Sequence, residues 1–419
     1  MMKSMNESSV ASKDSRTIVV CGAGNAAHVC VGEFSSNGFT VDGFAPFQNE
    51  SERWNAAIAK TGGDLIVDNP DGSQTIGRPR YISKKPAEII PGADIIVLPL
   101  PEFSLEPVLT AIKDYLRPGT IIMATPGGVV EWIARKALGP IFDKICLAVV
   151  QPMPYNCRIK EFGRRVNLIG KKREYSIACY PRNRIDEVGE YVTEMWNGTS
   201  ITKRKYFLSL TLNNANSIIH PQRLYGLLHE YKEGDTLPEN PFFYEDMDDF
   251  SANLIEQCDI ELRNAIRMIE EKGGLEGLSA EFPPNSERIK KTYHDTISDM
   301  STYRSCFATN AAYKGIRCPF LKQNDGTFLP DFTNRYFTED IPGGSCMMKG
   351  INELCGLETP TIDKVVTFFQ KFLGKEYIVN GALNGRNAAE TKAPQNFGLT
   401  TLQMLCSSAK QPPGYDPEL

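Results

Sequence analysis

The sequence has no long apolar run and no excess of basic residues. No segment approaches the roughly 18 consecutive apolar residues of a membrane-spanning helix, so we expect no membrane anchor. Residues 1–16 lack the apolar core of a secretory signal, and we interpret them as a disordered tail. A net charge of -5 over 419 residues argues against nucleic-acid binding, which usually needs a basic face.

Paired cysteine motifs and internal repeats are also absent. The eleven cysteines are scattered through apolar stretches, and none belongs to a Cys-x-x-Cys pair. This scatter is typical of reduced, buried thiols rather than of a disulfide framework or a metal site. We therefore expect a cytoplasmic protein without a metal, and the length allows two or three domains.

A glycine turn close to the N-terminus is the most informative feature that is present. Residues 17–21 are strand-like, and they run directly into Gly-x-Gly-x-x-Ala and a helical pattern. The first glycine allows a tight turn, the second leaves room for a pyrophosphate, and the alanine lets the helix pack closely on a sheet. The unpaired N–H groups of the helix attract phosphate. The pattern predicts a nicotinamide-dinucleotide site that includes Gly22, Gly24, Asn25, Ala26 and Ala27.

Strand and helix patterns alternate up to about residue 205. Short apolar runs typical of doubly buried parallel strands occur at residues 93–98, 120–124 and 145–150. A hairpin is expected over residues 64–82, turning at Asp71-Gly72. Residues 17–207 are thus predicted to form a Rossmann-type α/β domain with a doubly wound parallel sheet. Pro101 follows the carboxyl end of one strand, where ligands bind in such sheets, and is a candidate cofactor contact.

Helical periodicity dominates the second half of the chain. One apolar stripe runs from residue 252 to residue 272 and ends at Gly273-Gly274. A second helix is predicted to start at Thr359-Pro360 and to stop at Gly374. Strand alternation is hard to find after residue 210. We predict an all-α domain at residues 208–419.

Only four histidines are available for acid–base chemistry. Three of them are better interpreted as structural or solvated: His28 in the first helix, and His229 and His294 in polar stretches. His220 begins the predicted helical domain among amide and hydroxyl side chains that could line a polar site, and Asn214 among them is a candidate substrate contact. Pro221 biases it away from a regular helix interior. A structural histidine remains the alternative.

A second polar stretch, residues 330–342, packs charges, amides and aromatics between two prolines. The planar fork of Arg335 suits bidentate binding of a substrate carboxylate. Asp340 could orient His220 and stabilise its charge. The alternative interpretation is a capped turn with surface ion pairs.

Several motifs together resemble the opine dehydrogenases of marine invertebrates, which form octopine, alanopine, strombine or tauropine. The resemblance covers nearly all of residues 17–407. Its motifs are the glycine turn with His28, residues 157–164, His220-Pro221 with Leu224-Tyr225-Gly226, residues 334–342, Gly374-Lys375-Glu376-Tyr377 and Pro394-Gln395.

The resemblance implies that NADH reduces the condensation product of pyruvate and an amino acid, which regenerates NAD in anaerobic glycolysis. By the same resemblance His220 is the acid/base, Asp340 is its partner, Arg335 binds the 2-oxo acid carboxylate, and Cys157 lies at the substrate site. The family also suggests a monomer. NADH as cofactor comes from the family, since the sequence is only permissive.

One departure from the family concerns the amine substrate. Octopine-forming members carry a glutamate before the motif at residues 157–164, where this chain has the neutral Gln151. A missing carboxylate disfavours arginine and favours a small donor such as glycine, alanine or taurine, to which Gln151 could donate a hydrogen bond.

Asp42 and two other functions remain open. Asp42 lies at about the distance from the glycines where an acidic residue binds ribose, but a solvated mid-strand position is the better interpretation. A two-domain hydroxy-acid dehydrogenase usually carries a catalytic lysine early in its second domain, and residues 208–231 contain none. A non-catalytic nicotinamide-binding regulator would lack His, Arg and Asp together.

Overall fold

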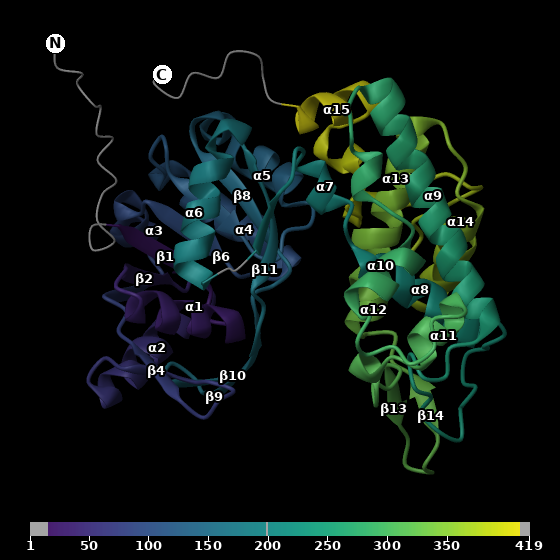
Figure 1. Ribbon diagram of the computed structural model, residues 1–419, viewed down its shortest axis with the longest axis horizontal. Coiled ribbons are helices and arrows are strands. Elements are labelled where there is room, and N and C mark those ends of the chain that lie inside the picture. The colour runs from purple at the N-terminus through teal and green to yellow at the C-terminus, as the bar shows by residue number, and fades with distance from the viewer. Residues whose placement is uncertain (1–15, 198–199, 411–419) are drawn as a thin grey trace. The chain divides into compact units, whose positions relative to one another are not determined.

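The computed structural model describes residues 16–197 and 200–410, which divide into two compact units (Figure 1). Unit 1 contains the described residues up to Leu212, and unit 2 is Asn213–Lys410. The sequence placed this boundary after residue 207. Helix α7 (Leu208–Thr211) stays in unit 1 because it packs on strand β11 (Glu174–Tyr180). The predicted tail lies outside the described residues except for Arg16.

An eight-stranded sheet forms the centre of unit 1, in the order β12-β11-β8-β7-β6-β1-β2-β5. Its other strands are β1 (Thr17–Cys21), β2 (Thr40–Phe44), β5 (Tyr81–Ser83), β6 (Ile95–Leu98), β7 (Ile121–Ala124), β8 (Cys146–Gln151) and β12 (Ser200–Lys203). The three predicted apolar runs are confirmed as β6, β7 and β8. The sheet departs from the predicted parallel arrangement at one end, where β11 pairs antiparallel with β8 and parallel with β12.

A second, four-stranded sheet has the order β4-β3-β10-β9. Its strands are β3 (Leu65–Asp68), β4 (Gln74–Gly77), β9 (Tyr155–Glu161) and β10 (Arg165–Lys171). The predicted hairpin is confirmed as β3–β4, with Gly72 at φ +85° in its turn. Its return strand ends at Gly77, because the chain leaves for β5 in the other sheet, so the predicted extension to residue 82 is wrong. The β9–β10 pair interrupts the predicted alternation of strands and helices.

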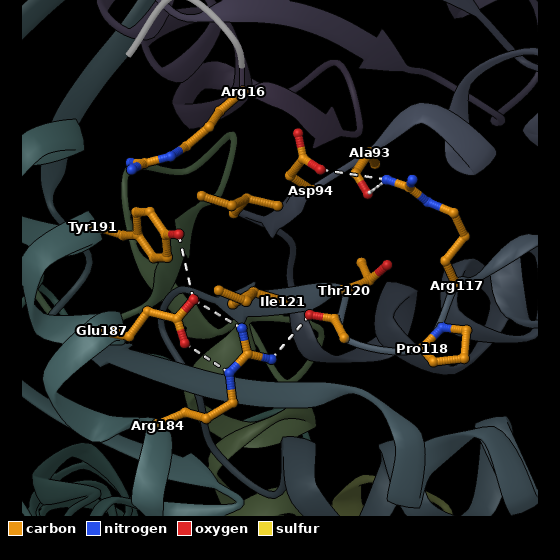
Figure 2. A pocket seen from close by; sticks show the side chains of 12 residues that line it. Arg16, Ala93, Asp94, Arg117, Pro118, Thr120, Ile121, Arg184, Glu187 and Tyr191 are labelled. Carbon is orange, nitrogen blue, oxygen red and sulfur yellow. Dashed lines mark hydrogen bonds and ion pairs between the residues drawn. The ribbon is translucent and has the colours of Figure 1, made fainter. Parts of the chain in front are cut away.

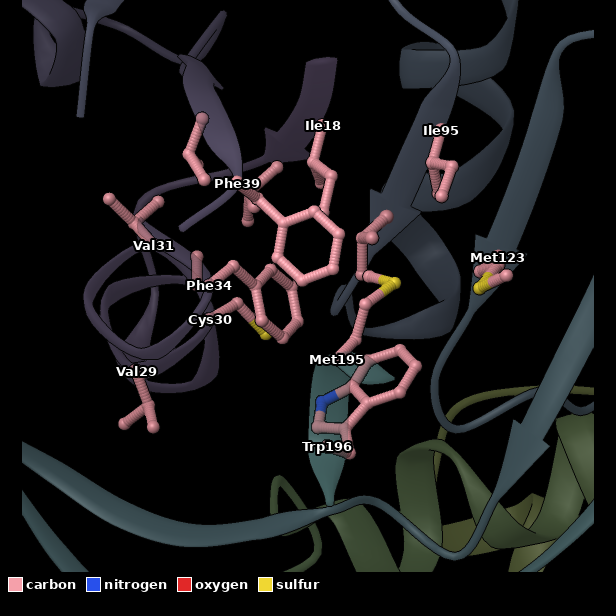
Figure 3. Close-up of a cluster of buried hydrophobic side chains, with 14 of the residues drawn as sticks. Ile18, Val29, Cys30, Val31, Phe34, Phe39, Ile95, Met123, Met195 and Trp196 are labelled. Carbon is pink, nitrogen blue, oxygen red and sulfur yellow. The ribbon is translucent and has the colours of Figure 1, made fainter. Parts of the chain in front are cut away.

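Helix α1 (Asn25–Ser36) packs against both sheets of unit 1. Phe34 on this helix meets Trp196 edge to face, with ring centroids 5.4 Å apart, inside the apolar cluster of Figure 3. Truncating a buried aromatic of this size typically costs about 3–5 kcal/mol. The remaining helices of the unit are α2 (Glu50–Ile58), α3 (Pro86–Ile89), α4 (Leu105–Ile112), α5 (Val130–Leu138) and α6 (Ile185–Trp196).

Unit 2 is built around helices α8 (Ala215–Leu228) and α9 (Asp249–Gly273). The two approach closely at Gly226, where an added Cβ would lie 2.1 Å from Ser251 Oγ. The predicted stripe is confirmed in α9, which Gly274 ends at φ +67°. The helix predicted from Thr359 is α14 (Pro360–Phe372). The others are α10 (Asn285–Thr292), α11 (Tyr303–Ala308), α12 (Arg335–Thr338), the π-helix η10 (Asp340–Ser345), α13 (Cys346–Cys355) and α15 (Leu402–Ala409).

The predicted helical character of unit 2 is confirmed with one addition. Strands β13 (Phe320–Lys322) and β14 (Phe328–Pro330) form a small antiparallel hairpin. Three-residue strands are too short to give a recognisable alternation in the sequence.

Candidate active site

The glycine turn joins β1 to α1 as its sequence predicts. Gly22 adopts φ +90°, and its N–H donates to the carbonyl oxygen of Phe44 over 2.7 Å. A Cβ at this position would lie 2.6 Å from Leu100 Cδ2. Both the dihedral angle and the lack of space therefore require glycine here.

The start of α1 fits a dinucleotide pyrophosphate. Gly24 is exposed, and a Cβ built on it has no neighbour within 4 Å, so its backbone is open to a ligand. The first-turn N–H groups of Asn25, Ala26 and Ala27 have no acceptor inside the helix. The Oδ1 of Asn25 accepts the Ile159 N–H over 2.8 Å. The groups of Asn25 that can donate to a phosphate are therefore its backbone N–H and its side-chain Nδ2.

Two further candidates for the cofactor differ in their positions. Pro101 is exposed just after β6, at the carboxyl edge of the sheet. Asp42 is only 2% exposed, and Arg80 Nε donates to its Oδ1 over 3.0 Å. The prediction of a solvated Asp42 is wrong, because Arg80 from a distant part of the chain pairs with the carboxylate in the middle of β2.

His220 projects from the second turn of α8 and is 5% exposed. Its Nδ1 lies 2.8 Å from Asp340 Oδ2, at the start of η10. A carboxylate can only accept, so Nδ1 carries the proton. Tyr336 stacks on the ring with centroids 4.0 Å apart, and Phe243 meets it edge-on at 5.3 Å. The predicted pairing of His220 with Asp340 is present, inside an aromatic cage.

The backbone at His220 differs from the prediction. Helix α8 continues through Pro221, so His220 lies in the helix and not outside a regular helix interior. Local preference is overridden here by packing, because most residues of α8 are buried against neighbouring elements.

Arg335 is the first residue of α12, and its side chain is 74% exposed. Its Nη2 donates to Glu339 Oε2 over 2.6 Å, and this hydrogen bond raises the pKa of the guanidinium. Tyr336, the next residue, is the one that stacks on His220. Arg335 is thus an accessible cation beside the His220–Asp340 pair.

The other predicted substrate contacts lie in varied surroundings. Gln151 Nε2 donates to the carbonyl oxygens of Gly127 and Leu210, so both of its N–H groups are used within unit 1 and none is left for a substrate. The Cys157 thiol is buried in the apolar core, which raises its pKa to about 11. Asn214 is half-buried immediately before α8 and does not cap it with its side chain.

The remaining histidines take the roles expected of them. His28 is fully buried, and both of its ring nitrogens are hydrogen-bonded. His229 and His294 are exposed. None of these three histidines is among the residues described above as contacting His220, which are Asp340, Tyr336 and Phe243.

One neighbour of His220 was not predicted. Tyr244 Oη lies 3.4 Å from His220 Nε2, and the Tyr244 side chain is almost completely buried. The sequence around it, residues 241–244, is an apolar and aromatic run without a recognisable motif. Only the tertiary structure brings it to a histidine 24 residues earlier.

A cavity of about 420 Å³ lies at the amino edge of the main sheet, where β1, β6 and β7 begin (Figure 2). This edge is opposite to the carboxyl edge, where Pro101 lies. The three arginines of the cavity are hydrogen-bonded to the protein: Arg184 to Glu187 and the Gly119 carbonyl, Arg117 to Asp94 and the Ala93 carbonyl, and Arg16 to Glu194. We assign it no part in the reaction. Over residues 16–197 and 200–410, no helix is long and apolar enough to cross a membrane.

Comparison with known proteins identifies the family. A family model described as NAD/NADP octopine/nopaline dehydrogenase, alpha-helical domain, matches residues 203–373. Octopine dehydrogenase of Pecten maximus is 33% identical over 94% of this chain and 99% of its own. Tauropine dehydrogenase of Arabella iricolor is 32% identical over 93% of this chain and 99% of its own.

Solved structures of octopine dehydrogenase agree. One with NADH and L-arginine and one with NADH and pyruvate are each 30% identical and cover 96% of this chain and 100% of theirs, with TM-scores of 0.86 and 0.81. The glycine turn and the His220–Asp340 pair therefore occur in a chain that matches these enzymes from end to end. This protein belongs to the opine dehydrogenases and is an NAD-dependent oxidoreductase.

Proposed function

We propose that this opine dehydrogenase condenses pyruvate with a small amine, glycine, alanine or taurine, and reduces the product with NADH. The observation that supports this proposal most directly is the His220–Asp340 pair, in which Nδ1 and Oδ2 are 2.8 Å apart. Condensation releases one water, and reduction adds a hydride to the 2-oxo carbon and a proton to the nitrogen. Bound NADH supplies the hydride.

His220 is proposed as the acid/base. Because Asp340 holds Nδ1–H, Nε2 is the ring atom left to exchange a proton with the substrate. Asp340 keeps the ring oriented and favours its charged form.

Arg335 is proposed to bind the carboxylate of the 2-oxo acid. Its exposed guanidinium already donates one hydrogen bond to a carboxylate, that of Glu339, and its planar fork is suited to bind a substrate carboxylate through two. The cofactor pyrophosphate is assigned to the backbone from Gly22 to Ala27, where Gly24 is open and the helix N–H groups are unpaired.

The choice of amine rests on position 151. The octopine and tauropine dehydrogenases are nearly equally similar to this chain, at 33% and 32% identity, so overall similarity does not select a donor. Gln151 is neutral and holds two backbone carbonyls, so this position offers no carboxylate to a guanidinium. The proposed preference for a small amine is therefore supported by the missing negative charge at position 151. The expected hydrogen bond from Gln151 to the substrate no longer supports it.

Two features of the protein outside the site are also proposals. We propose a monomer, which light scattering tests, since a mass close to twice 46.6 kDa would contradict it. We propose a reducing, cytoplasmic compartment, supported by eleven cysteines that are all free thiols.

The test is oxidation of NADH by the purified protein with pyruvate and a panel of amines. We expect turnover only when both pyruvate and an amine are present. Turnover with pyruvate alone would indicate a hydroxy-acid dehydrogenase. NADH binding without any turnover would indicate a regulator.

A further inference from the structure

The imidazole of His220 has partners at both nitrogens. Asp340 Oδ2 takes Nδ1–H over 2.8 Å, and Tyr244 Oη faces Nε2 at 3.4 Å. In the proposed function, Nε2 is the atom that exchanges a proton with the substrate. A buried hydroxyl, 7% exposed as a residue, thus lies within hydrogen-bonding distance of the reactive nitrogen.

Tyr244 is held in this position from several sides. Its ring stacks on Tyr313 with centroids 4.1 Å apart and an interplanar angle of 19°. The preceding residue, Phe243, donates its N–H to the Ile316 carbonyl over 2.8 Å. Arg223 Nε donates to the Phe243 carbonyl over 2.8 Å, and Nη2 donates to that of Asp246 over 2.9 Å.

Arg223 connects the segment that contains Tyr244 to the helix that carries His220. It lies on α8 three residues after His220, so one helix carries both the imidazole and the cation that fixes the segment of Tyr244. Arg223 is 1% exposed, and its guanidinium donates hydrogen bonds to this segment and to Ser251. The distance between the hydroxyl and the imidazole is therefore set by buried contacts.

We propose that Tyr244 is a positioning residue for His220, whose hydroxyl holds Nε2 in both protonation states of the ring until the substrate takes its place and exchanges the proton. The inference rests on the proposed role of His220 as acid/base. The hydroxyl donates to Nε2 when the ring is neutral, and it accepts from Nε2–H when the ring is charged.

The two states are not stabilised equally. A hydrogen bond from a charged donor is roughly twice as strong as a neutral one, so Tyr244 favours the imidazolium, as Asp340 does. Burial, with a smaller effect of neighbouring tyrosines and Asp340, raises the pKa of Tyr244 well above its ordinary value. The group therefore remains a hydroxyl across the working range.

The other groups around His220 are accounted for. Asp340 comes from η10, and Tyr336 from α12 stacks on the ring. Arg335 and Glu339 of the same region pair with each other. Helix α9 contacts α8 at Gln222 and Arg223, and α14 contacts it at Tyr225. The charged groups among these residues are unchanged in Tyr244→Phe and in Tyr313→Phe. A difference in the His220 titration midpoint between these two variants is therefore caused by the Tyr244 hydroxyl.

The test is an NMR titration of isotope-labelled histidine in the wild type, in Tyr244→Phe and in Tyr313→Phe. The chain has four histidines, and His220→Asn assigns the signal. Tyr244→Phe keeps the ring packing and should move the titration midpoint of His220 to lower pH by about half a unit. Tyr313→Phe removes a hydroxyl one ring away and should leave the midpoint unchanged.

Kinetics supply a second readout. Tyr244→Phe should lower kcat by about fivefold to tenfold, with the KM for NADH unchanged. An unmoved midpoint in Tyr244→Phe, or an equal shift in Tyr313→Phe, would overturn the inference. Because the titration needs no turnover, it judges Tyr244 even if the wild type fails with every amine, a result that would overturn the proposed function instead.

Discussion

His28 Nε2 accepts a hydrogen bond of 2.8 Å from the backbone N–H of Gly163, which ties helix α1, the helix after the glycine turn, to the turn after β9. Because Nε2 accepts, Nδ1 carries the proton and donates it to the Gly24 carbonyl over 2.9 Å. Trp54 stacks on the ring with centroids 4.2 Å apart. The fold therefore requires a neutral imidazole, and burial lowers the pKa of His28 to about 4.

This relationship predicts a loss of stability in mild acid. The unfolded chain protonates His28 near its ordinary pKa of 6.5, and the folded protein only near about 4, so the stabilisation is complete above 6.5 and is lost as pH falls between these values. Between about pH 7 and about pH 5 the wild type should lose about 2 kcal/mol more unfolding free energy than His28→Gln, measured by urea denaturation. Exposed His294→Gln is the control and should behave as the wild type does. Equal losses in wild type and His28→Gln would contradict the account.

His220→Ala should lower turnover by roughly a hundredfold or more, the usual contribution of general acid–base catalysis. NADH binding, measured by fluorescence titration, should be retained, because the glycine turn belongs to unit 1 and His220 to unit 2. His229→Ala, a change at an exposed position on the same chain, is the control. Turnover close to the wild-type value would remove His220 from the mechanism.

Asp340→Asn should keep the fold but shift the pH profile. The carboxylate accepts Nδ1–H and carries the charge that complements a protonated ring, whereas the amide that replaces it is neutral. In the proposed mechanism a protonated His220 is the acid of opine formation, so the falling limb of the pH–rate profile should move to lower pH in this variant. An unchanged profile would reduce Asp340 to a structural cap of η10.

A pair of glycine variants separates backbone strain from cofactor contact. Gly22→Ala should lower the melting temperature, because its φ of +90° and the 2.6 Å approach to Leu100 both oppose a side chain. Gly24→Ala has open space, so it should melt close to the wild type yet bind NADH more weakly, since the methyl group occupies the approach of the pyrophosphate. Normal NADH affinity in Gly24→Ala would displace the cofactor from this turn.

The sequence predicted those parts of the fold and site that depend on local pattern. The glycine turn, the apolar strands β6 to β8 and the striped helices α9 and α14 all follow from spacing and composition. The pairing of Asp340 with His220 was also predicted, although only as one of two interpretations of a polar loop.

The parts that were missed depend on long-range contacts. Strands β9 and β10 carry several charged residues in a small sheet, in which β9 is the edge strand, so they give no apolar run. Asp42 looked solvated because its partner, Arg80, lies 38 residues away. Tyr244 is placed beside His220 by long-range contacts of its segment, among them those with Arg223 and Tyr313.

The final prediction concerns the amine. A guanidinium that is desolvated without a carboxylate is poorly compensated by a neutral amide, and Gln151 provides only that. We expect kcat/KM for arginine, at saturating pyruvate, to be about tenfold or more below the values for glycine, alanine and taurine. A preference for arginine over all three would refute the proposal.

Substitution at this position separates charge from structure. Gln151→Glu adds the missing carboxylate, but it also removes the N–H groups that hold the Gly127 and Leu210 carbonyls. Gln151→Met removes the same donors without adding charge, so it is the matched control. If residue 151 faces the amine, Gln151→Glu should raise the ratio of arginine to alanine activity relative to Gln151→Met, because only the glutamate can pair with the guanidinium. Equal ratios in the two variants would mean that the amine is selected at other residues, and that Gln151 serves only to hold the end of β8 against its neighbouring loops.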